Sequence, residues 1–272
     1  MISTRHRFAT AAVLAACAAG LLTGCGDDDK KADDTPASTT TVDGKGDGQK
    51  ASGASAEACT AYTKVSAAFG SEEPPDASTL SPVLDTLDDE APSEIADSVA
   101  VMTDAARKVL DSNGEDTSAF DSPEFPKAQG EVEPYFFENC DFDTKLEVTA
   151  KEFAFEGIPE TLKAGQVAML LTNDGAEAHE MGIVKKKDGV TESFDDLLAL
   201  PEEQAMDKVE MVNGTFVPRK GSQSMLVADL EPGDYMAVCF IPTGTTIDDS
   251  GEHEGSGPPH FVQGMKAEFT VS

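Results

Sequence analysis

Apolar residues in the first half of the chain recur at intervals of three and four, which is the spacing of amphipathic helices. The clearest such stretch begins at Pro92 and ends at Asn113-Gly114, a pair that is typical of a helix end. Further helices are expected over residues 57–69, 81–88 and 123–138. Residues 56–142 are therefore predicted to form a small helical domain.

After residue 142, apolar and polar residues alternate, as they do in strands with one buried face. Strands are expected over residues 146–150, 167–172, 225–228, 235–240 and 267–271, with turns at 163–165, 173–175, 187–189 and 231–234. Many short strands separated by turns indicate a β-sandwich over residues 143–272. Residues 194–211 have helical spacing, so one helix is expected between two strands. The predicted fold class is mainly β, with the helical domain preceding the sandwich.

The first 24 residues have the pattern of an export signal. Arg5 and Arg7 precede an apolar stretch, Ala9 to Leu22, that is too short to span a bilayer as a helix. Leu22-Thr23-Gly24-Cys25 then has the form of a lipobox, in which small residues fit the peptidase and the cysteine sulfur receives the lipid. The mature chain is expected to be held by a lipid on Cys25 at the extracytoplasmic face of the cell membrane.

The composition predicts a disordered tether and excludes nucleic acid as a partner. Residues 25–55 contain almost no large apolar side chain, so they are expected to form a disordered tether. The chain has 20 basic and 51 acidic residues, a formal net charge of −31. Such a charge repels nucleic acid and anionic lipid head groups and favours cationic partners. It also keeps an exported protein soluble.

Four of the five cysteines have separate explanations. Cys17 lies in the apolar part of the signal, and Cys25 is the expected lipidation site. Cys59 and Cys140 flank the helical segment, and an exported protein meets an oxidising compartment in which they can pair. Their bridge would close a loop of about eighty residues and stabilise a domain that is short of large apolar side chains. Cys239 is left without a partner.

Three segments of the second half of the chain carry a resemblance. Leu230-Glu231-Pro232-Gly233-Asp234-Tyr235 leads into Val238-Cys239-Phe240, His179 follows the Asn173-Asp174-Gly175 turn, and His260-x-x-x-Gly264-Met265 lies near the C-terminus. In their chain order, His179 first, then Cys239, His260 and Met265, these segments resemble a cupredoxin, a blue-copper domain of the plastocyanin and azurin type, over residues 143–272. The resemblance implies a Greek-key sandwich with one type 1 copper. It also implies His179, Cys239 and His260 as equatorial ligands and Met265 as the weak axial ligand.

This donor set also suits copper on chemical grounds. Soft sulfur ligands stabilise Cu(I) and imidazoles stabilise Cu(II), so two histidines, a cysteine and a distant methionine serve both oxidation states. Of the four histidines, His6 leaves with the signal, and only His179, His253 and His260 remain. A trinuclear copper cluster would need many more histidines, so an enzyme of the multicopper type is not expected.

The sequence departs from the family pattern in the length of one loop. In plastocyanin-like loops the second histidine follows the cysteine after a few residues, whereas twenty residues separate Cys239 from His260. His253 lies within this excursion and could replace His260 or join it. His260 is preferred because the rigid Pro258-Pro259 pair precedes it and a terminal strand follows it. The loop also carries four acidic residues, Asp248, Asp249, Glu252 and Glu254, which could form a docking rim or a solvated loop.

Three functions fit these features. The first is one-electron transfer at the outer face of a membrane, with a redox protein as partner, for which the acidic charge favours a cationic one. The second is binding and delivery of copper by a lipoprotein to a copper-exchange partner. The third is a ligand-binding or structural sandwich that holds no metal. The sequence contains neither a nucleophile-base-acid arrangement nor a phosphate-binding glycine loop that would indicate an enzyme.

Overall fold

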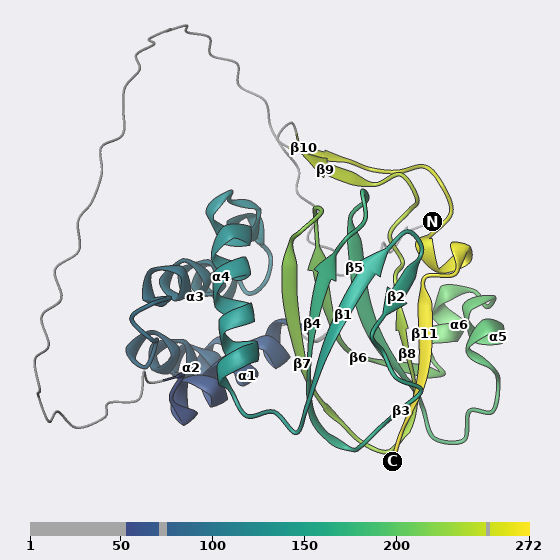
Figure 1. Cartoon of the computed structure of the whole chain (residues 1–272), viewed down its shortest axis with the longest axis horizontal. Helices are drawn as coiled ribbons and strands as arrows, with labels where there is room; N and C mark the ends of the chain where they lie inside the picture. Colours follow the sequence, from purple (N-terminus) through teal and green to yellow (C-terminus); the bar gives the residue numbers. More distant parts are fainter. Residues whose placement is uncertain (1–52, 71–74, 249–250) are drawn as a thin grey trace, which may run out of the picture.

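The computed structural model describes residues 53–70, 75–248 and 251–272, and four helices precede the strands in it (Figure 1). They are α1 (Ala56–Gly70), α2 (Ala77–Asp89), α3 (Ala96–Asp111) and α4 (Glu124–Asn139), with a 3-10 turn η1 (Ser118–Asp121) before α4. Each overlaps a segment in which the apolar spacing predicts a helix. No helix in these ranges is long and apolar enough to cross a membrane. The predicted signal, Cys17, Cys25 and the tether up to residue 52 lie outside the described residues.

Two sheets follow the helices and pack face to face (Figure 1). The first contains, in spatial order, β2 (Ala154–Glu156), β1 (Thr144–Lys151), β4 (Gly165–Asn173) and β7 (Gln223–Leu230). The second contains β3 (Thr161–Leu162), β11 (Lys266–Val271), β8 (Gly233–Val238), β5 (His179–Lys186) and β6 (Val209–Val217). A separate hairpin consists of β9 (Thr246–Asp248) and β10 (Gly251–His253). The predicted β-sandwich preceded by a helical region is confirmed.

The main core lies between the two sheets and consists of the side chains that point inward from both. From the first sheet it contains Val148, Val167, Met169, Leu171, Leu226 and Leu230, and from the second Met181, Ile183, Tyr235, Ala237, Phe269 and Val271. Cys239 and Met265 are part of the same buried cluster. Burial of apolar surface is the main favourable term in folding, so this core also fixes the strand ends at which these two residues lie.

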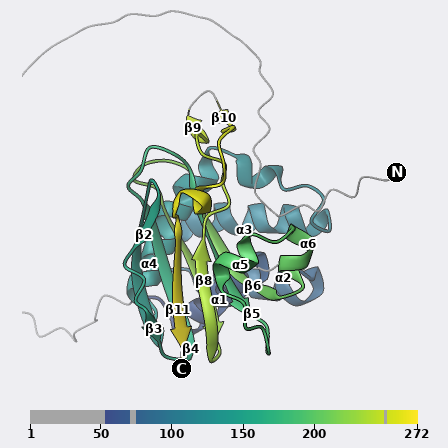
Figure 2. The same ribbon diagram turned by 90° about the vertical axis from the view of Figure 1, so that its right-hand side faces the viewer.

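The outer face of each sheet is also covered (Figures 1 and 2). Helices α1 and α4 pack on the outer face of the first sheet, where Ala168, Leu170, Met225 and Val227 belong to one buried cluster with residues of the helices. Phe194 and Leu197 pack on Val184, Met236 and Val238 of the second. Because both faces of β4 are covered, its residues from Val167 to Leu171 are all buried, and the alternation expected there is only partial.

The single helix predicted over residues 194–211 is wrong. Two short helices, α5 (Phe194–Leu198) and α6 (Glu202–Met206), occupy most of this segment, and Val209 begins β6. Pro201 separates the helices because it lacks an N–H donor and disfavours a helical conformation in the residue before it. β5 and β6 are absent from the predicted strands, yet they pair antiparallel along their whole length, with His179 opposite Val217.

Two contacts hold the helical region in place. Cys59 of α1 is bonded to Cys140, directly after α4, as predicted. The buried carboxylate of Glu133 in α4 accepts a hydrogen bond from the Met225 N–H of β7 at 2.6 Å and another from the Gln129 amide at 3.2 Å. Since β7 is the edge of its sheet, this carboxylate satisfies a backbone donor that no neighbouring strand pairs. Burial raises the pKa of Glu133 to about 7.

Loss of the disulfide should destabilise the protein strongly. The bond joins residues 81 positions apart, and closing a loop of this size is worth about 4–5 kcal/mol in the chain-entropy description. We expect a double variant with Cys59→Ala and Cys140→Ala to unfold at a clearly lower urea concentration than the wild type, measured by circular dichroism. An unchanged midpoint would show that the apolar contacts with the first sheet suffice to hold the helices.

Stability should fall as the pH rises from about 4.5 towards 7, because of Glu133. Its pKa is raised from 4.5 to about 7 in the folded protein, so the folded state holds the proton more tightly than the unfolded state. The resulting stabilisation is complete below the unfolded pKa and is lost as the pH rises through the folded one, about 3 kcal/mol in total. We expect Glu133→Gln to flatten this part of the profile of unfolding free energy against pH. Parallel profiles for the two proteins would contradict the assignment.

Candidate metal centre

The strand order brings His179, Cys239 and Met265 to one end of the second sheet. β5 begins at His179, and its antiparallel neighbour β8 ends one residue before Cys239. The start of one strand and the end of an antiparallel neighbour lie at the same end of a sheet. Met265 directly precedes β11 on the other side of β8, and its carbonyl accepts a hydrogen bond from the Cys239 N–H at 3.2 Å.

The long excursion after Cys239 returns His260 to the same place. The His260 N–H donates to the Ile241 carbonyl at 2.9 Å, and the Phe261 N–H donates to the Cys239 carbonyl at 3.0 Å. The 3-10 turn η2 (His260–Gln263) begins at this point and leads directly to Met265, whose N–H donates to the His260 carbonyl at 3.1 Å. Backbone hydrogen bonds therefore fix the two ends of the excursion beside each other.

His253 occupies a different position from His260. It is exposed and lies on β10, opposite Thr246 of β9. Among the described residues, the only group that could hold a metal ion consists of His179, Cys239 and His260. The structure thus brings together the three predicted equatorial ligands and leaves His253 outside the group.

The three donor atoms have the spacing of ligands on one metal ion. His179 Nδ1 lies 3.2 Å from His260 Nδ1, and Cys239 Sγ lies 3.4 Å from His260 Nδ1. With metal–nitrogen bonds of about 2.0–2.1 Å and a metal–sulfur bond of about 2.3 Å, ligands around one tetrahedral or trigonal metal lie about 3.2–3.8 Å apart. All three side chains are completely buried, as is Met265. The residues present therefore fit a metal ion with two nitrogen ligands and one sulfur ligand.

A carboxylate lies beside the far nitrogen of each histidine. His260 Nε2 is hydrogen-bonded to Glu177 Oε2 at 3.0 Å. His179 Nε2 lies 3.3 Å from Glu152 Oε1 but outside hydrogen-bond geometry, and no other described group bonds to it. A carboxylate favours the N–H on the nitrogen that faces it, which leaves the lone pair on Nδ1. Two lone pairs that face each other at 3.2 Å repel unless a cation or proton lies between them.

The turn that carries His179 is organised by Asn173. This side chain is buried, and its amide donates to the carbonyls of Glu177 at 2.8 Å and Val217 at 3.0 Å. Its oxygen accepts the Gly175 N–H at 2.8 Å, which closes the Asn173-Asp174-Gly175 turn predicted from the sequence. Because Val217 pairs with His179 in the sheet, the same amide links the turn to the strand that holds the histidine.

Burial sets the protonation of the site in the absence of metal. It raises the pKa of the Cys239 thiol to about 12, with the nearby carboxylates adding to the effect. It lowers the pKa of His179, and the neighbouring His260 lowers it further. Burial alone would raise the pKa of Glu152, but the N–H groups of Glu177 and Ala176 bond to it and hold the value below the usual range. A bound metal cation would supply the positive charge that stabilises the Cys239 thiolate at this buried position.

Glu152, Phe153 and Glu177 are contacts of the site that sequence reasoning missed. Glu177 lies between the predicted turn at residues 173–175 and His179, so its position was a usable signal. Glu152 follows β1 in the other sheet, and no local pattern places it near a histidine. The ring of Phe153 contacts that of His260, with centroids 4.9 Å apart.

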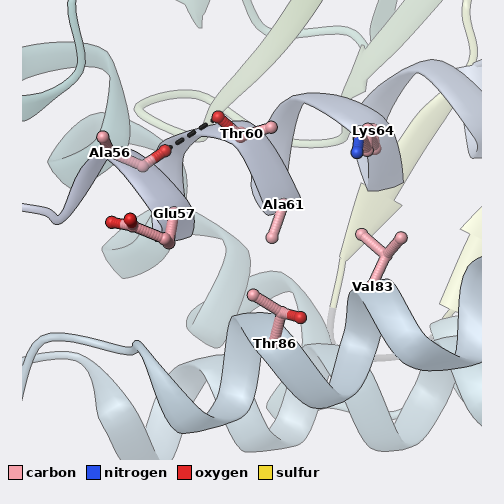
Figure 3. A pocket seen from close by; sticks show the side chains of 7 residues that line it. All are labelled: Ala56, Glu57, Thr60, Ala61, Lys64, Val83 and Thr86. Atoms are coloured by element: carbon pink, nitrogen blue, oxygen red, sulfur yellow. Dashed lines mark hydrogen bonds between the residues drawn. The ribbon is translucent and has the colours of Figure 1, made fainter.

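A second candidate site, a cavity of about 280 Å³ between α1 and α2, has a different character (Figure 3). It is lined by Ala56, Glu57, Thr60, Ala61, Lys64, Val83 and Thr86. The hydroxyl of Thr60 bonds to the Ala56 carbonyl within its own helix. The lining contains no histidine or cysteine, so the metal centre remains the site with evident chemistry.

Comparison with solved structures finds a distant likeness to auracyanins. No protein-family model matches the chain, and no curated protein matches it. Reduced auracyanin from Roseiflexus castenholzii is 20% identical, with 47% of this chain and 96% of that one covered and a TM-score of 0.32. Auracyanin A from Chloroflexus aurantiacus, a "blue" copper protein, is 17% identical, with 47% and 98% covered and a TM-score of 0.31. At such low scores the function has to be inferred from the site itself.

A methyl group at Gly175 should weaken metal binding. A Cβ there would lie 2.7 Å from His179 Nε2 and would also collide with the Glu152 carboxylate, so one of the two groups would have to move. For Gly175→Ala we expect Cu(II) affinity to fall at least about tenfold, measured by competition with a coloured chelator. Gly130→Ala in α4 is the matched control, since a Cβ there meets nothing within 4 Å. Equal affinity in the two variants would show that the His179 ring is free to shift.

Proposed function

We propose that this protein binds one copper ion through His179, Cys239 and His260, with Met265 as the weak axial ligand, and that it transfers single electrons. The observation that carries the proposal is the convergence of two histidine Nδ1 atoms and a thiol sulfur within 4.8 Å in a fully buried position. Bound copper would supply a one-electron couple between Cu(I) and Cu(II), and this mixed nitrogen and sulfur set serves both states.

The protein surroundings suit electron transfer because they hold the ligands still. His179 begins a central strand, and Cys239 and Met265 lie at the adjoining ends of β8 and β11, joined by a backbone hydrogen bond. Met265 shares the core between the sheets with Cys239, which supports its role as axial ligand. Ligands that are fixed by packing and hydrogen bonds move little when the charge of a metal changes.

Burial favours electron transfer over copper delivery. Delivery requires that a partner reach the metal and replace its ligands, whereas all four side chains are fully buried. Glu180 and Met181, beside His179, do not open a path. Glu180 bonds to the Phe240 N–H at 2.9 Å, and Met181 is buried in the core between the sheets.

We also propose that the protein is lipid-anchored through Cys25 at the extracytoplasmic face of the cell membrane and that its redox partner is cationic. The lipobox-like sequence and the tether support the anchor. The Cys59–Cys140 disulfide supports an oxidising compartment. The formal charge of −31 supports a partner of opposite charge, whose association would weaken as the salt concentration rises.

Copper binding should give the spectrum of a copper–thiolate site. We expect the purified protein, loaded with Cu(II), to show intense visible absorption and a small hyperfine splitting in electron paramagnetic resonance, with reversible one-electron voltammetry. Cys239→Ser should abolish the absorption and His260→Ala should change or abolish the spectrum. The control is His253→Ala, which removes an exposed histidine of β10 and should leave the spectrum unchanged. A colourless wild-type protein would refute the proposal.

A further inference from the structure

Glu177 connects the two histidines of the site. Its carboxylate bonds to His260 Nε2 at 3.0 Å and also accepts the N–H of Gly244 from the long loop. Its backbone N–H donates to Glu152 Oε1 at 2.7 Å, and that same oxygen lies 3.3 Å from His179 Nε2. One residue thus bonds directly to one histidine and holds the carboxylate that lies beside the other.

The two carboxylates also cover the outer edges of the imidazoles. Both histidine side chains are completely buried, whereas the side chains of Glu177 and Glu152 are 18% and 27% exposed. Each carboxylate therefore lies at the boundary between an imidazole and solvent. Two carboxylates beside the imidazoles place negative charge close to the metal position, in surroundings where charges are only partly screened.

Resting on the copper site proposed above, we propose that Glu177, supported by Glu152, is a positioning residue that orients both imidazoles and lowers the reduction potential of the copper. The hydrogen bond to Glu177 fixes the His260 ring with Nδ1 towards the metal position and increases the basicity of that nitrogen, while the Glu152 carboxylate beside His179 Nε2 favours the same orientation of the second ring. Negative charge nearby stabilises Cu(II) more than Cu(I), because Cu(II) carries the larger positive charge. Loss of the Glu177 charge should therefore weaken Cu(II) binding selectively.

Glu177→Gln tests the charge, because glutamine keeps an acceptor for His260 Nε2–H. We expect its Cu(II) affinity to fall about tenfold and, if Cu(I) affinity is unchanged, its potential to rise by about 59 mV, the one-electron equivalent of that factor. Glu177→Ala also removes the hydrogen bond and should lose up to about 100-fold in Cu(II) affinity. The control is Glu254→Gln, which removes one charge from an exposed position in the loop between Cys239 and His260. It should change neither the Cu(II) affinity nor the reduction potential.

Affinities are measured by chelator competition for each oxidation state and potentials by voltammetry, with circular dichroism of the copper-free proteins to verify folding. A Glu177→Gln variant that binds copper with wild-type affinity and potential overturns the role of Glu177 while leaving the copper site intact. A wild type without a copper–thiolate spectrum refutes both. Should Glu177→Gln fail to fold, Glu152→Gln applies the same test at His179, with the same direction of change expected.

Discussion

The metal centre depends on one constraint, which is that the Nδ1 atoms of His179 and His260 face each other at 3.2 Å. The carboxylate of Glu177 favours the proton on Nε2 of His260, which leaves the Nδ1 of that ring unprotonated. When the Nδ1 of His179 is unprotonated as well, the arrangement is unfavourable without a positive charge between the rings. Cys239 adds a third donor 3.4 Å from His260, and its thiol is neutral unless a cation stabilises the thiolate. The geometry is that of a site prepared for a metal.

The helical region contributes to this rigidity although it supplies no ligand. α4 bonds to the edge strand β7 through Glu133, and α1 and α4 pack on the outer face of this sheet. β4 ends at Asn173, the residue that organises the turn before His179. The sheet that carries this turn is therefore covered on both faces, which limits the ways in which its end can deform. The disulfide closes the helical layer by joining its two ends.

Local and compositional signals were sufficient to predict much of this structure. The helices before residue 140, the sandwich and the Cys59–Cys140 bond follow from spacing and from the cysteine count. The single helix expected over residues 194–211 does not form because Pro201 interrupts the helical conformation between α5 and α6, and the segment from Val209 onward belongs to β6. The position of Glu152 beside His179 could not be predicted from the sequence, for another reason. Its role arises from the packing of one sheet on the other, and such contacts leave no trace in the spacing of neighbouring residues.

The length of the loop between Cys239 and His260 matters less than its ends. Extending a loop from about five to about twenty residues costs only about 1 kcal/mol in closure entropy. Backbone bonds from His260 to Ile241 and from Phe261 to Cys239, together with the bridge between Pro242 and Pro259, close the base of the excursion. Such hydrogen bonds contribute about 1 kcal/mol each, so they offset the cost. The length of the excursion can then vary while the histidine at its end stays beside the cysteine.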